Sequence, residues 1–153
     1  MSLSPRLVRD RIQAQISSEL GASGWRLSPF IFDNFDLTPR DIWHLGFAVG
    51  LGQSVPSASD RRQKHAGSSA VTGVMVETLV RVRFGHQVRA DNQIADEGAA
   101  LDAELALAAA VMGIAGDTGM RVTLARVAER ITGGDGTQFR GELQFTAWHR
   151  YAL

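Results

Sequence analysis

The sequence predicts an α+β fold with a helix at the N-terminus, an antiparallel or mixed sheet of about four or five strands, and a second helix packed on that sheet. Three observations predict this class. Two segments place apolar residues at helical spacing, at residues 5–20 and 92–112. Four segments alternate in the period of a strand, and the last two form a C-terminal hairpin. The chain has the length of one domain, and neither a repeat nor a linker divides residues 1–153.

The first helix is expected at residues 5–20. Ser4 supplies a capping hydroxyl, Pro5 suits the first helical position, and Gly21 ends the segment. Between these signals an apolar residue recurs every four positions, at Val8, Ile12, Ile16 and Leu20. Residues 25–32 are then expected to form a short extended stretch broken by Pro29, and residues 33–39 a turn.

A strand is expected from residue 42 to residue 51. Its bulky residues alternate with slim ones, the bulky set being Trp43, Leu45, Phe47, Val49 and Leu51. The slim face predicts close approach by another backbone or another sheet. Residues 52–70 lose this alternation and are rich in Ser, Gly and basic residues. A loop of that length within a compact domain is functional or disordered.

The remaining elements are a long strand, a helix and a hairpin. Residues 71–84 alternate throughout, and at about 3.3 Å per residue this strand could exceed ~40 Å and extend beyond its own core. The second helix is expected at residues 92–112, with Gly113 at its end. Its predicted core-facing residues are Ile94, Gly98, Leu101, Leu105, Ala108 and Met112. Residues 122–132 and 138–152 flank a glycine-rich turn typical of a hairpin.

The composition excludes several classes of protein. Lys and Arg total 16, as do Asp and Glu, so net charge favours neither nucleic acid nor an acidic membrane. The absence of cysteine excludes a disulfide scaffold, thiolate zinc sites and a cysteine nucleophile, and it favours a reducing compartment. The N-terminus lacks a signal-peptide pattern, and no apolar run approaches the ~18 residues of a membrane span. We therefore expect a soluble protein.

No catalytic residue, cofactor site or metal site is predicted. The four histidines, at 44, 65, 86 and 149, lack the spacing of a metal-binding helix. The segment Asp33-Asn34-Phe35-Asp36 lacks the glycine and glutamate of a calcium loop. The serines of 52–70 include no nucleophile elbow, and Gly50-Leu51-Gly52 is only a fragment of a dinucleotide-binding motif. The sequence therefore predicts a protein that is not an enzyme.

The distribution of charge suggests an interface between copies. Between residues 90 and 120 there are six acids and no Lys or Arg, the acids being Asp91, Asp96, Glu97, Asp102, Glu104 and Asp117. One interpretation is a solvated helix whose early acids favour its N-terminal dipole. The other pairs acids of one copy with bases of the next, in a head-to-tail interface. Its expected residues are Arg61, Arg62 and Lys64 on one side and Glu97, Asp102 and Glu104 on the other.

The element order resembles that of the tail terminator, or tail-completion, proteins of long-tailed bacteriophages, the lambda terminator type included. Three features carry the resemblance: the helix at 5–20, the strand VMVETLVRVRF, and the run DEGAALDAELALAAAVMG leading to a hairpin that ends FTAWHRYAL. The resemblance implies a ring, expected to be hexameric, that caps the head-proximal end of the tail tube, stops tube growth and docks the head connector. It implies as partners the tail tube protein and the head-closure protein, with genomic DNA passing through the lumen unread.

This resemblance places the protein in the virion tail or neck, and in the host cytoplasm during assembly. Two alternatives stay open within the class: a tail tube protein and a head-closure protein. From another class, a small ligand-binding or enzymatic α+β domain could use His44, His86 or His149. A buried pocket containing two of these imidazoles would favour that alternative.

Overall fold

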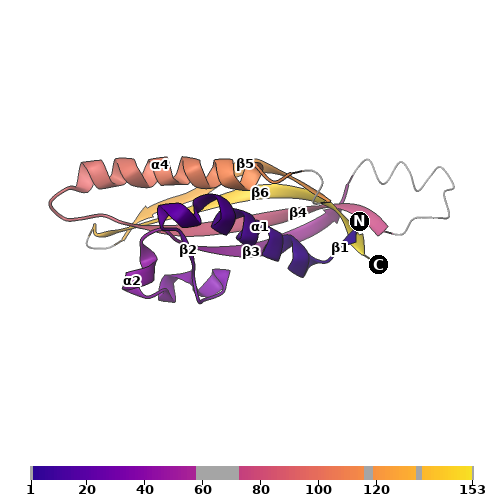
Figure 1. The fold of residues 1–153 in the computed structure, drawn as a ribbon, viewed down its shortest axis with the longest axis horizontal. Coiled ribbons are helices and arrows are strands. Elements are labelled where there is room, and N and C mark those ends of the chain that lie inside the picture. The colour runs from indigo at the N-terminus through magenta and orange to yellow at the C-terminus, as the bar shows by residue number, and fades with distance from the viewer. Residues whose placement is uncertain (1, 58–72, 116–118, 134–135, 153) are drawn as a thin grey trace.

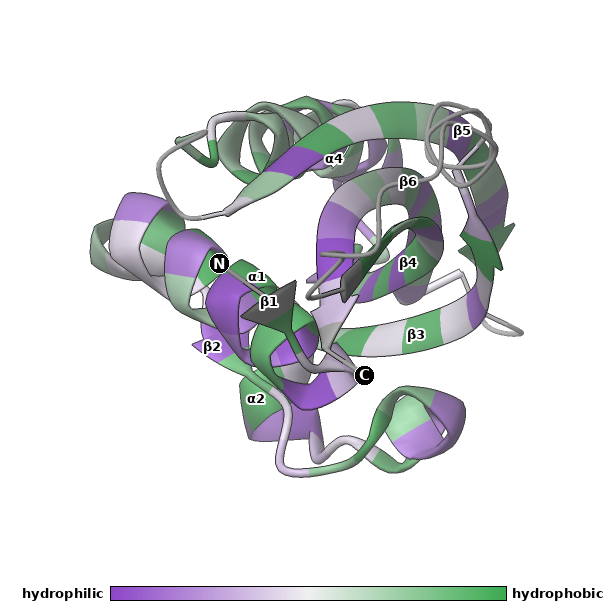
Figure 2. Cartoon of the chain, turned by 90° about the vertical axis from the view of Figure 1, so that its right-hand side faces the viewer, coloured by the Kyte–Doolittle hydropathy of each residue, from purple (hydrophilic) through white to green (hydrophobic). Residues whose placement is uncertain are grey.

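The predicted α+β class is confirmed by the computed structural model, which describes residues 2–57, 73–115, 119–133 and 136–152. Four long strands form an antiparallel sheet in the order β5-β6-β4-β3: β3 (Gly46–Pro56), β4 (Gly73–Gln87), β5 (Met120–Thr132) and β6 (Gln138–Ala152). Two short strands pair in parallel, β1 (Ser2–Leu3) with β6 and β2 (Arg26–Leu27) with β3. The helices α1 (Pro5–Leu20) and α4 (Gln93–Met112) lie side by side on one face of this sheet (Figures 1 and 2).

Helix α1 has the predicted boundaries. The Ser4 hydroxyl accepts a hydrogen bond from the backbone N–H of Leu7 at 3.2 Å, as expected of a cap. Val8, Ile12 and Ile16 are fully buried. These side chains attach α1 to the sheet, and burying each of them stabilises the fold by about 1.5–3 kcal/mol.

The main core lies between the two helices and the sheet. Its sheet side consists of alternate residues of neighbouring strands, such as Val82 opposite Leu143 and Val80 opposite Phe145. Trp25, which precedes β2, contacts Phe84 with ring centroids 5.8 Å apart. The even-numbered residues of β4 and the odd-numbered residues of β6, which the alternation predicts to share one face of each strand, therefore face the same core.

The segment before β3 differs from the prediction. A 3-10 helix, η2 (Phe32–Leu37), and a short helix, α2 (Arg40–Trp43), occupy it, so the strand begins at Gly46 rather than at residue 42. The backbone N–H of Trp43 bonds to the carbonyl of Pro39 at 2.9 Å, and Leu45 has a φ of 59°. This turn places Trp43 on the sheet face opposite to Phe47. The alternation through Trp43 and Leu45 misled the prediction because it continued, by chance, across a helical turn.

Close approach to the slim face of β3 occurs at Gly50, as predicted, but the neighbour differs from the one predicted. A Cβ atom at Gly50 would lie 2.7 Å from the side chain of Phe32, so only glycine lets η2 pack this closely. The neighbour is a side chain of η2 rather than another backbone or sheet. The segment from η2 to α2 thereby covers the β3 side of the sheet face that α1 and α4 leave free.

The prediction of a loop over residues 52–70 is wrong for its first five residues. Residues 52–56 belong to β3, where the Ser54 and Thr78 hydroxyls lie 2.7 Å apart across the strand pair. Cross-strand pairing with β4 therefore continues where the sequence loses its apolar alternation. Residues 58–70, with Arg61, Arg62 and Lys64, lie outside the described residues.

Helix α4 has the predicted boundaries within one residue, but its predicted core face is wrong. Of the predicted set only Ala108 is buried, whereas Ile94 is 92% exposed and Leu105 71%. The core-facing side instead carries small and acidic residues: Asp96, Ala100, Glu104, Leu107, Ala108, Ala110 and Val111. The acids can be buried because each pairs with an arginine. Among the described helices none has the length and apolar character to cross a membrane.

The closing hairpin is confirmed, although β5 is less regular than predicted. Its pairing with β6 shifts register twice, between Leu124 and Arg126 and between Val127 and Glu129. Each shift is a bulge, which bends and twists a strand locally.

Candidate functional site

Four surface features could carry function: the free edges of the sheet, an apolar stripe on α4, a groove beside α1 and a cavity between two histidines. Within the described residues, no three His, Asp or Glu side chains gather closely enough to hold a metal ion. The candidate sites therefore include surfaces that could bind another protein as well as groups of reactive side chains.

Within the described residues, the sheet has two long edges without a full strand partner, on opposite sides. Along β3, the strand β2 pairs only with Gly46 and Phe47, and residues 52–56 are exposed. Among the described residues no strand pairs with the outer edge of β3 beyond that point. Strand β5 likewise has only β6 as a strand partner in the described part of the chain. Unpaired N–H and C=O groups at such edges are able to bond to a strand of another chain.

The exposed face of α4 carries a stripe of large apolar side chains, here called the α4 stripe: Ile94, Leu101, Leu105 and Met112. Intervals of four and seven residues place the four side chains on one line along the helix. Glu97 and Asp102 are also exposed, and at about 100° per residue they flank the stripe on its two sides. A continuous apolar surface bordered by charge is typical of a protein contact.

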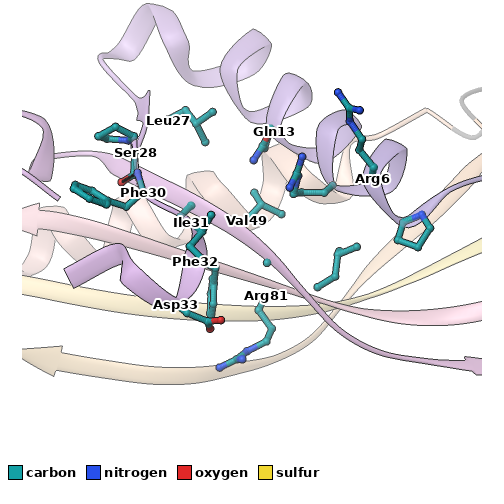
Figure 3. Close-up of a pocket in the computed structure, with 16 residues that line it drawn as sticks. Arg6, Gln13, Leu27, Ser28, Phe30, Ile31, Phe32, Asp33, Val49 and Arg81 are labelled. Carbon is teal, nitrogen blue, oxygen red and sulfur yellow. Dashed lines mark hydrogen bonds between the residues drawn. The ribbon is translucent and has the colours of Figure 1, made fainter. Parts of the chain in front are cut away.

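A groove of about 580 Å³ runs between α1, the segment 27–33 and the free edge of β3 (Figure 3). It is here called the α1 groove. Leu27, Phe30 and Ile31 line one wall and are exposed, while Val49 and Leu51 of β3 lie at its floor. Arg6 and Arg9 stand on the α1 side and share one carboxylate, that of Asp10, at 3.5 and 2.9 Å. Two guanidinium groups with one carboxylate leave the α1 side of the groove positively charged, whereas the segment 27–33 contributes the carboxylate of Asp33.

The sheet face opposite to α1 and α4 contacts η2 through a charged cluster. Glu142 is 3% exposed and accepts hydrogen bonds from Gln144, Arg83 and Arg81. Burial raises the pKa of Glu142, but these hydrogen bonds outweigh it, so the pKa lies below its usual value. Arg81 and Arg83 also stack on the ring of Phe32, at 4.4 and 4.2 Å. This cluster joins elements of the subunit itself.

The predicted interface acids fall into two groups. Glu97 and Asp102 are exposed and flank the α4 stripe, so they are available to another molecule. Glu104 instead forms an ion pair with Arg130 of β5 at 2.7 Å, and its carboxylate is mostly buried. Asp96 pairs in the same way with Arg89 at 2.9 Å. The acid-only segment is thus partly neutralised within the chain.

Two of the four histidines lie together. The rings of His44 and His86 are 4.4 Å apart, beside a cavity of about 420 Å³ that Arg89 and Asp96 also line. His44 is exposed and accepts a hydrogen bond through Nδ1 from the backbone N–H of Gln87 at 3.2 Å, whereas His86 is buried. Burial first, and then His86, lowers the pKa of His44. No sequence pattern indicates this pair, because it depends on β4 meeting the turn before β3.

His149 lies elsewhere, in the core between β4 and β6. Its Nε2 is 2.7 Å from the hydroxyl of Thr78, and burial lowers its pKa. His65 lies outside the described residues. The condition that would favour a ligand-binding domain is therefore met in part, by one buried and one exposed imidazole.

No protein-family model matches this sequence, and a search of curated proteins finds no match either.

Proposed function

We propose that this chain is a structural subunit that assembles with copies of itself into a ring, and that the ring terminates a phage tail tube. The observation that carries the proposal is the pair of free sheet edges, on β3 and β5, at opposite sides of one sheet. When the β5 edge of one copy meets the β3 edge of the next, the backbone groups of both become paired. The two surfaces differ, so the contact is head-to-tail, and it closes into a ring where the rotation permits.

The terminator role rests on the resemblance in element order and is supported by the α+β fold. In this role a ring, expected to be a hexamer, caps the head-proximal end of the tube and ends its polymerisation. The tail tube protein binds one side of the ring and the head-closure protein the other. DNA passes through the lumen. The protein then resides in the tail or neck of the virion, with host cytoplasm as the site of assembly.

Two measurements test this proposal. Light scattering and negative-stain images of the purified protein should show closed rings. Tail tube protein polymerised with the chain present should give shorter tubes that carry a ring at one end. A strictly monomeric protein at high concentration, with tube length unchanged, would overturn the proposal.

A small ligand-binding domain is the second candidate, favoured by the cavity beside His44 and His86. Its test is the imidazole NMR spectrum recorded with zinc or a nucleotide. Specific, saturable shifts of both rings would support ligand binding, and their absence would leave assembly as the function of the chain.

A further inference from the structure

We infer that the α4 stripe of one copy lies in the α1 groove of the next copy. The inference rests on the proposed self-assembly and names the surfaces that meet. In Figure 1, α4 lies along the top of the subunit and α1, which borders the groove, lies below it. The ridge and the hollow are different surfaces of one molecule, as a head-to-tail contact requires.

The two surfaces match in chemistry. The α4 stripe presents Leu101 and Leu105, and the α1 groove presents Leu27, Phe30 and Ile31 as exposed apolar walls. Burying one against the other removes apolar area from water on both copies. Neither surface is covered by another described segment of its own chain.

The charges determine which surfaces pair. Glu97 and Asp102 border the stripe, whereas Arg6 and Arg9 border the groove. Packing α4 on α4 of a second copy would bring these acids together without a basic residue on either helix. The α1 side of the groove offers opposite charge, so the head-to-tail pairing is favoured there and the symmetric pairing is disfavoured.

The sheet order leads to the same arrangement. Helix α4 lies beside β5, to which Glu104 and Arg130 attach it, and α1 lies beside β3. Joining the β5 edge to the β3 edge of the next copy therefore brings α4 next to the neighbour's α1. One interface would extend both the sheet layer and the helix layer.

Cysteine cross-linking tests this contact directly, because the natural chain contains no cysteine. Leu105→Cys and Ile31→Cys are placed at exposed positions on the stripe and the groove wall. A mixture of the two single variants should form a disulfide-linked dimer, and the double variant a ladder up to the full ring. Leu105→Cys alone should form none.

Four results would overturn the inference. Dimers of Leu105→Cys alone would mean that α4 packs on α4. Efficient linkage of Ile31→Cys to Leu124→Cys on β5, with none to Leu105→Cys, would mean that a strand fills the groove. Intact rings without any Leu105–Ile31 linkage would refute this contact while leaving the proposed ring standing, whereas a monomeric wild type would refute both.

A substitution test supplies an independent readout. Ile94→Glu combined with Leu105→Glu should raise the concentration for half-assembly at least about tenfold, since two apolar side chains that the contact would bury become charged. Ala95→Glu with Ala99→Glu is the matched control, because it adds the same charge on an exposed side of α4 away from the stripe. This control should change the concentration for half-assembly less than about threefold. Equal effects of the two pairs would count against the stripe, and circular dichroism confirms that each variant is folded.

Discussion

Arg130 of β5 donates two hydrogen bonds to the carboxylate of Glu104 on α4, at 2.8 and 2.7 Å, and thereby ties the helix to the outermost strand of the sheet. Glu104 is largely removed from water while Arg130 stays half exposed. A carboxylate in such a place depends on its partner, since an unpaired buried charge is costly.

We expect Glu104→Ala to lower the free energy of subunit unfolding by about 1–3 kcal/mol, because the paired carboxylate and its packing are lost. Urea unfolding at pH 7 measures the change. Glu97→Ala is the matched control, since Glu97 is exposed on the same helix, and it should stay within about 0.5 kcal/mol of the wild type. If both variants lose equal stability, the Arg130 contact contributes nothing.

We expect Gly50→Ala to destabilise the subunit by about 1–3 kcal/mol, because the added Cβ meets Phe32 at 2.7 Å and η2 must move. Gly21→Ala provides the control: nothing lies within 4 Å of its Cβ and its φ of −58° suits alanine. That substitution should stabilise the protein by about 0.4–1 kcal/mol. Thermal unfolding distinguishes the two, and a neutral Gly50→Ala would show that η2 is not held against β3.

Stability should fall on acidification from about pH 7 to about pH 5. The pKa values of His44 and His149 lie below 6.5 in the folded state, so the unfolded chain binds more protons as the pH drops. Each neutral histidine contributes to the free energy of unfolding. This contribution is complete above the pKa of the histidine in the unfolded chain, and it is lost as the pH falls through the pKa in the folded state. His149→Gln should flatten the profile, measured by urea unfolding at several pH values. A profile unchanged by that substitution would assign the pH dependence to other groups.

Charge reversal tests which basic residues meet Glu97 and Asp102 in the proposed interface. Arg6→Glu with Arg9→Glu should slow assembly and weaken it up to about tenfold at low salt, with partial rescue by Glu97→Lys and Asp102→Lys. The alternative partner is the basic cluster of Arg61, Arg62 and Lys64. If Glu97→Lys and Asp102→Lys rescue assembly of the Arg61→Glu, Arg62→Glu variant but not of the Arg6→Glu, Arg9→Glu variant, the basic cluster is the partner. Screening predicts that either effect fades above about 0.5 M salt.

The free edge of β3 should be protected from hydrogen exchange only in the assembly. Backbone N–H groups of residues 49–55 that point away from β4 are expected to exchange quickly in an isolated subunit and slowly in a ring. The core strand pair of β4 and β6 serves as the internal reference. Unchanged exchange at these positions on ring formation would show that the sheet edge is not part of the interface.

The parts of the fold that the sequence predicted depend on local signals. Ser4, Pro5 and Gly21 delimit α1, Gly113 ends α4, and unbroken alternation identifies β4. The short helix α2 was missed because its residues continued the alternation of the strand after it. The predicted core face of α4 failed for a different reason. Asp96 and Glu104 are buried because they form ion pairs with Arg89 and Arg130. No local sequence pattern indicates which acid meets such a partner.

The two bulges of β5 bear on how the unassembled protein avoids aggregation. A flat, regular edge strand accepts almost any extended peptide, including the same edge of an identical chain. The register shifts after Leu124 and Val127 divide the edge of β5 into short stretches of different twist. Indiscriminate pairing is therefore hindered, and only a partner strand of matching curvature can follow the whole edge. Many subunits that have not yet joined the proposed ring could then accumulate without forming fibres.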